Sequence, residues 1–161
     1  MWFKCISLVL ASLFGMVAHS APGIAKNAPS KLSTLQGITL GMSKYDSLLM
    51  YKKNNVPVKD VRMNMSLINM RFNRRPATFI FIYSEDKLNM ITVNISMEGK
   101  PDSERSKIFD SDAKFLESKF GEPSMKDFGG MAVGWKYDVG FVMYKWVAKY
   151  QQFTLTFDGK N

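Results

Sequence analysis

The chain has 161 residues, of which 46% are hydrophobic and 22% are charged, and its formal net charge is +8. This composition is typical of a globular domain and excludes a largely disordered chain. The single cysteine and the single histidine are Cys5 and His19. The chain beyond residue 20 therefore cannot form a disulfide, a zinc site of thiolates and imidazoles, or a catalytic group that needs a histidine base.

Residues 1–20 have the layout of a secretory signal peptide. A positively charged start ends at Lys4, an apolar run follows, and Ala18, His19 and Ser20 form a small-x-small cleavage site before Ala21. The apolar run is shorter than the roughly 20 residues that span a bilayer. A membrane anchor and a buried helix are the alternatives. We expect cleavage after residue 20, no membrane-spanning segment in the mature chain, and secretion to a bacterial periplasm, because disulfides are absent.

Residues 21–36 contain two prolines and several small polar residues, which predicts a flexible lead. A helix is then expected from Ser43, because Ser43 and Asp46 have the spacing of a capping box. Asn54, Asn55 and Pro57 should end it. Alternating or continuous apolar residues predict strands over 58–72, 78–83 and 91–97.

The second half begins at a break over residues 99–104, where Asp102 or Ser103 should cap a second helix. An apolar stripe, formed by Phe109, Ala113, Leu116 and Phe120, predicts that this helix is amphipathic. Gly121 and Pro123 should end it. Further strands are expected over 125–128, 131–137, 141–148 and 153–157.

The predicted order is therefore a helix followed by strands, twice over. Strands joined by turns of two to four residues must be antiparallel. We predict a single α+β domain over 37–161, with halves 37–98 and 99–161 and with both helices packed on one face of an antiparallel sheet.

The segment LGMSKYDSLL at 40–49 resembles the opening of small bacterial envelope domains, including outer-membrane assembly lipoproteins with a β-lactamase-inhibitor-protein-like fold. LESKFGEP at 116–123, followed by GWKY at 134–137, is similar to a helix end and strand in related periplasmic domains. The resemblance implies an α+β fold and a role in binding or inhibition rather than catalysis. Unlike the assembly lipoproteins, this chain has no cysteine at the end of its apolar run.

The excess positive charge lies in the first half of the chain. Residues 21–100 hold 12 Lys and Arg against 5 Asp and Glu, whereas residues 101–161 hold 9 of each. The candidate partner-binding cations are Lys52, Lys53, Arg62, Arg71, Arg74 and Arg75. A basic surface attracts anionic partners, although it also serves solubility. We expect a protein or an anionic envelope component, and no nucleic acid, because no recognition motif is present.

Aromatic residues supply the other candidate surface. Trp135, Tyr144 and Trp146 lie on predicted strands, and rings on a sheet face that the helices leave uncovered would bind a partner. The alternative is that these rings are buried in the core, where large aromatic side chains are usually found.

Methionine offers an alternative function. Met63 and Met65 would share one face of a continuous strand, with Met70 close by. Thioethers are ligands for Cu(I), but methionine also fills irregular gaps in cores. We expect no resident metal or cofactor.

Paired carboxylates give no indication of catalysis. Asp110 and Asp112 are two apart on the second helix and should face different directions, and Glu85 and Asp86 lie in a predicted turn. We expect all four to be solvated and assign no catalytic residue. The sequence thus predicts an exported, non-catalytic binding protein, in one form an inhibitor or immunity protein. A Cu(I)-binding protein or an enzyme without His and Cys is the alternative, and the oligomeric state stays open.

Overall fold

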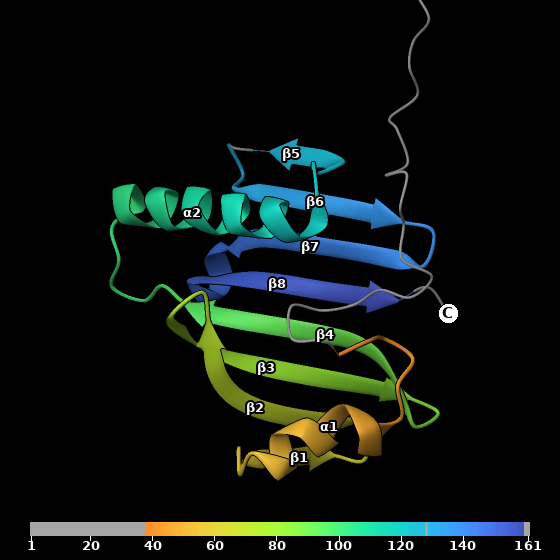
Figure 1. Ribbon diagram of the computed structural model, residues 1–161. Helices are drawn as coiled ribbons and strands as arrows, with labels where there is room; N and C mark the ends of the chain where they lie inside the picture. The colour runs from red at the N-terminus through yellow and green to blue at the C-terminus, as the bar shows by residue number, and fades with distance from the viewer. Residues whose placement is uncertain (1–37, 128, 160–161) are drawn as a thin grey trace, which may run out of the picture.

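The protein is described here by a computed structural model, which covers residues 38–127 and 129–159. Within these residues the fold comprises two α-helices and one eight-stranded antiparallel sheet (Figure 1). This confirms the predicted α+β class, with strands forming the larger part. The predicted signal peptide at 1–20 and the lead at 21–36 lie outside the described residues.

The elements follow one another as one helix and four strands, twice. They are α1 (Lys44–Lys53), β1 (Val58–Arg62), β2 (Met65–Phe72), β3 (Arg75–Ser84), β4 (Lys87–Ser96), α2 (Asp102–Phe120), β5 (Met125–Asp127), β6 (Ala132–Tyr137), β7 (Gly140–Val147) and β8 (Gln152–Gly159), with a short 3-10 helix at Ala148–Tyr150 between the last two. The strand order is β1-β2-β3-β4-β8-β7-β6-β5. The last strand therefore joins the two strand groups by pairing with β4.

The helix ends follow local chemistry in most places. Ser43 caps α1 as predicted, since its Oγ accepts a hydrogen bond from the Asp46 amide at 3.0 Å. Gly121 ends α2 at a positive φ of 80°, which glycine adopts without strain. The predicted cap of the second helix is wrong: Pro101 holds the N-cap position without a side-chain hydrogen bond, and Asp102 is the first helical residue.

The predicted single strand over 58–72 is divided into β1 and β2. Met63 and Asn64 form the turn between them, and the Asn64 carbonyl accepts a hydrogen bond from the Tyr83 amide at 2.9 Å. Met63 is 95% exposed in this turn. Met63 and Met65 therefore do not share one face of a continuous strand, and the expected pair of thioethers is not formed.

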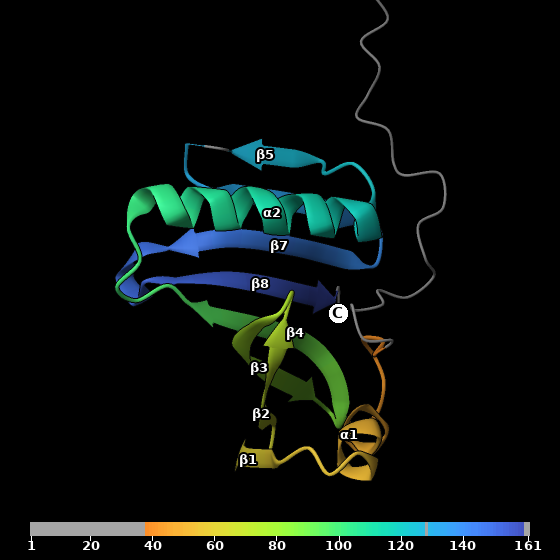
Figure 2. The same ribbon diagram turned by 60° about the vertical axis from the view of Figure 1, so that its left-hand side comes forward.

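The core lies between the helices and the sheet. Tyr51 of α1 contacts Phe81 with ring centroids 5.7 Å apart, and Phe109 of α2 contacts Phe153 at 5.9 Å. The register connects Phe81 through Ile91 to Phe157 of β8, whose side chain lies on the same face as that of Phe153. We call this the helix face; Figure 2 shows how strongly the sheet twists between β1 and β7.

Candidate functional site

The opposite side of the sheet, called the open face below, carries the alternate positions of every strand. One continuous row across seven strands shows its character: Leu67, Ile80, Thr92, Thr156, Met143, Gly134 and Met125. Apolar residues occupy both ends of this row, and threonines occupy its middle. The neighbouring row adds Met65, Ile82, Met90 and Phe141. The open face thus combines two apolar areas with a polar stripe between them.

Side-chain hydrogen bonds connect several polar residues of the open face. Thr78 Oγ1 donates to Asn69 Oδ1 at 3.0 Å, and Thr154 Oγ1 donates to Asn94 Oδ1 at 3.2 Å across β4 and β8. The Asn and Thr side chains therefore hold each other in place.

Cations border the apolar areas. Lys59, Arg71, Lys136 and Lys145 are exposed at open-face positions of β1, β2, β6 and β7, while Asp127 and Asp158 are carboxylates on the same face. Cations at these positions attract a negatively charged partner, and salt weakens the attraction.

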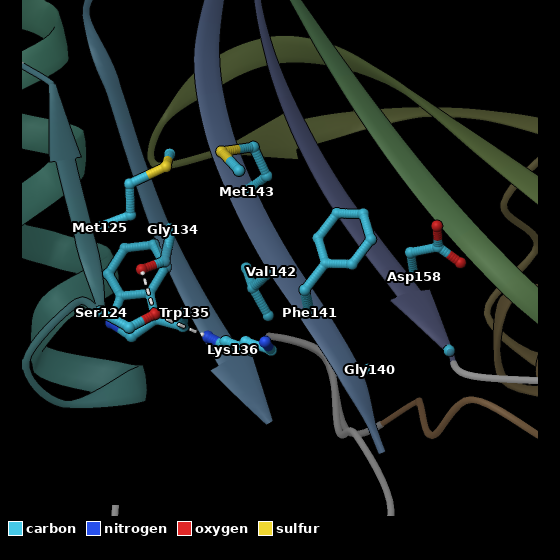
Figure 3. Close-up of a pocket in the computed structure, with 11 residues that line it drawn as sticks. Ser124, Met125, Gly134, Trp135, Lys136, Gly140, Phe141, Val142, Met143 and Asp158 are labelled. Carbon is cyan, nitrogen blue, oxygen red and sulfur yellow. Dashed lines mark hydrogen bonds between the residues drawn. The ribbon is translucent and has the colours of Figure 1, made fainter. Parts of the chain in front are cut away.

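A groove of about 650 Å³ lies at the β5–β8 end of the open face. Figure 3 shows Met125 and Met143 on either side of Gly134, with Phe141 and Asp158 farther along the sheet. A Cβ on Gly134 would lie 3.2 Å from Met143 Cε and 3.5 Å from Met125 Cε. The missing side chain at Gly134 therefore leaves room for the two thioether side chains, whose methyl groups lie directly above its backbone.

Ser124 closes the sheet edge beside the groove. Its Oγ donates to the Gly134 carbonyl at 3.2 Å and accepts from the Lys136 amide at 2.9 Å (Figure 3). This single hydroxyl thus satisfies two backbone groups of β6, the Gly134 carbonyl and the Lys136 amide, at an edge that the short β5 does not fully cover.

Asp158 is the acidic group of the groove, and burial raises the pKa of its carboxyl. The folded protein therefore holds this proton more tightly than the unfolded chain does. As the pH rises through the interval between the ordinary and the raised pKa, the unfolded chain releases the proton first, so the free energy of unfolding falls.

We therefore expect Asp158→Asn to be more stable than the parent protein at pH 7, with the difference vanishing below the ordinary carboxyl pKa of about 3.9. Urea unfolding of both proteins across this pH range measures the effect. The exposed Asp138 in the β6–β7 turn provides the control, Asp138→Asn. Equal stability of parent and Asp158→Asn at pH 7 would contradict the expectation.

The predicted cations do not form one patch. Lys52 and Lys53 are exposed at the end of α1, and Arg62 is exposed at the end of β1. Arg71 and Arg74 are exposed near the opposite end of β2, roughly 25 Å away at about 3.3 Å per strand residue. Among the predicted cations, Arg71 lies on the open face, and Arg62 is paired in register with the open-face residue Met65.

Arg75 is partly buried and is paired with a carboxylate of α2. It forms an ion pair with Asp112, whose side chain is fully buried. Asp112 also accepts hydrogen bonds from Asn73 Nδ2 and Tyr144 Oη, both at 2.7 Å. The expectation that Asp112 is solvated is wrong, whereas Asp110 is exposed as expected. Asp112 is three residues after Phe109 and four before Leu116, which places it on the buried stripe; that spacing was the overlooked signal.

The predicted aromatic surface is not exposed. Trp135 and Tyr144 are buried on the helix face, where Trp135 Nε1 donates to the Gly121 carbonyl at 2.7 Å. Burial and the neighbouring Asp112 raise the pKa of Tyr144 well above its usual range. Trp146 is half-buried against Phe153, beneath the Arg105 guanidinium at 4.9 Å from the ring centroid. These rings stabilise the core, since α2 covers the strands that carry them.

Within 38–127 and 129–159, no group of three or more His, Cys, Asp or Glu side chains has an arrangement that could hold a metal ion. Neither of the two described helices combines the length and apolar character of a membrane span. Comparison with models of protein families, with curated proteins and with solved structures finds no match to this chain. The resemblance to envelope domains with an inhibitor-like fold therefore stays a prediction.

Proposed function

We propose that this chain is an exported, non-catalytic binding protein that holds an anionic component of the bacterial cell envelope on its open face. One observation carries this proposal: the open face joins apolar areas to exposed cations, while both described helices contact the other side of the sheet. Phe141 and Met125, at 39% and 43% exposure, are among its accessible apolar side chains. Apolar area combined with cations suits a partner that has both an apolar part and negative charge.

The signal-peptide-like pattern of residues 1–20 and the absence of a thiol or imidazole beyond residue 20 support the rest of the proposal. An inhibitor or immunity protein would present the same face to an acidic protein surface. The lining of the groove favours a lipid-like component, because it consists mostly of carbon and sulfur atoms. A protein partner is therefore an outcome of the test rather than a second proposal.

The test is flotation with vesicles made of equal parts phosphatidylglycerol and phosphatidylcholine. We expect the protein to float with these vesicles at low salt and to be released from them at high salt. It should not float with vesicles of phosphatidylcholine alone. Replacing the open-face cations Lys59, Arg71, Lys136 and Lys145 by glutamine should weaken binding at least tenfold, since each such cation contributes about 1 kcal/mol near an anionic surface.

The matched control removes the same charge from the helices. Lys52, Lys53, Lys107 and Lys114 are exposed on α1 and α2, and their replacement by glutamine should change binding much less. An equal loss in both variants would assign the effect to net charge alone and contradict the role of the open face. Absence of any vesicle binding, with tight salt-sensitive binding to an acidic protein instead, would replace the envelope component by a protein partner.

A further inference from the structure

The groove on the open face has the size and lining of a small-molecule site. Its volume of about 650 Å³ lies within the range of roughly 300–1,000 Å³ that is common for ligand pockets. Met125, Phe141 and Met143 supply the apolar walls, and the Gly134 backbone forms the floor. Few polar groups reach the groove, so its ligand must gain most of its affinity from apolar contact.

Backbone pairing in the groove disfavours an added peptide strand. The β6 and β7 backbones are paired with each other along their length, and β7 is paired with β8 on its other side. On the outer edge of β6, Ser124 Oγ donates a hydrogen bond to the Gly134 carbonyl and accepts one from the Lys136 amide. A peptide laid here would leave its own main-chain groups unpaired. An alkyl chain has no hydrogen bonds to satisfy.

The walls of the groove are adaptable. Met125 and Met143 are unbranched thioethers that reach over the Gly134 backbone. Methionine side chains change rotamer at small cost and fit irregular apolar surfaces. A flexible chain of methylene groups can therefore be enclosed without movement of the sheet.

Charge defines where a headgroup would lie. Lys136, Phe141 and Asp158 occupy one row on adjacent strands β6, β7 and β8. Lys136 and Asp158 are thus two strand spacings apart, about 10 Å. Lys136 is exposed and lines the groove, and Lys145 lies two residues beyond Met143 on β7. A negative headgroup is attracted toward Lys136 and away from Asp158.

We propose that this groove binds the alkyl chain of a single-chain anionic amphiphile, with the Lys136 ammonium at its headgroup. The inference rests on the proposed function and names the ligand that the open face takes. A fatty-acid carboxylate is the simplest molecule with this chemistry.

The experiment titrates dodecanoate, below its micelle concentration, into protein labelled with ¹³C at the methionine methyl groups. We expect the signals of Met125 and Met143 to shift in a saturable way. Met97 is buried away from the groove, and its signal should stay in place. Equal shifts at Met97 would indicate detergent-like loosening of the fold and overturn the proposal, as would the absence of any shift.

Variants separate the alkyl and the charge contributions. Gly134→Val would push the Met125 and Met143 side chains away from the floor of the groove, in a strand that accepts β-branched residues, and should weaken dodecanoate binding at least tenfold. Thr78→Val, on the open face but outside the groove, is the matched control. Lys136→Gln should weaken dodecanoate binding several-fold and leave the neutral dodecanol unaffected, whereas Asp158→Asn should tighten dodecanoate binding.

Unchanged dodecanoate binding in both Gly134→Val and Lys136→Gln would overturn the proposal. The two proposals fail separately. Vesicle binding that depends on the open-face cations, without methionine shifts on dodecanoate, would remove the groove ligand and retain the proposed function. Saturable dodecanoate binding without vesicle binding would remove the proposed function and retain the groove ligand, as a site for a soluble amphiphile.

Discussion

Replacement of Asp112 by alanine is expected to lower the free energy of unfolding by about 3 to 5 kcal/mol, because removal of one partner from a buried ion pair leaves the other uncompensated. Asp112 has no exposed side-chain area and accepts from Arg75, Asn73 and Tyr144. The variant would leave the Tyr144 hydroxyl and the Arg75 guanidinium without their acceptor. Urea unfolding followed by tryptophan fluorescence measures the loss.

The control for this prediction is Asp110→Ala. Asp110 lies on the same helix and has the same chemistry, but it is exposed. Its replacement should change the free energy of unfolding by no more than about 0.5 kcal/mol. Similar stability of the two variants would show that the Asp112 cluster contributes little, and that α2 is held to the sheet by its apolar contacts alone.

The second large effect is expected at Gly140, where β7 begins. Its φ is +150°, and a Cβ there would lie 2.1 Å from the Asp158 carbonyl oxygen and 3.1 Å from Gly159 Cα. Both are backbone positions of β8, so no side-chain rotation relieves the overlap. Gly140→Ala must therefore displace the β7–β8 pairing, and we expect a loss of about 2 to 4 kcal/mol in unfolding experiments.

Gly129→Ala is the matched glycine control. A Cβ at Gly129 would lie 3.6 Å from Asp127 Oδ1, an ordinary contact in an exposed loop. This variant should unfold within about 0.5 kcal/mol of the parent protein. If Gly140→Ala proved equally stable, the β7–β8 register beside the groove would have to differ from the one described.

Residues close in sequence were the most predictable. Ser43 and Asp46 interact within one helical turn, so their spacing alone was enough to place the start of α1. The alternation from Ile91 to Ile95 likewise predicted β4. The turn at Met63 and Asn64 was missed although asparagine is a common turn residue, because the apolar alternation continues through it.

The candidate site was not predictable in the same way. Met125, Gly134 and Met143 lie on three different strands, and only the register of β5, β6 and β7 brings them together. Arg75 and Asp112 are likewise brought together across the fold. Arg75 was therefore assigned to a surface for partners, although it neutralises a buried carboxylate.

Local patterns were sufficient for the α+β class and for most element positions, because caps, turns and alternation depend on neighbouring residues. Composition alone excluded thiol and imidazole chemistry beyond residue 20. The tertiary structure decided which side of each strand is covered. Alternation divides a strand into two faces, but only the position of α2 shows that Trp135 and Tyr144 lie beneath it and that Met125, Phe141 and Met143 do not. For this reason the candidate binding surface is the groove lined by Met125, Met143 and Lys136, and not the predicted aromatic rings.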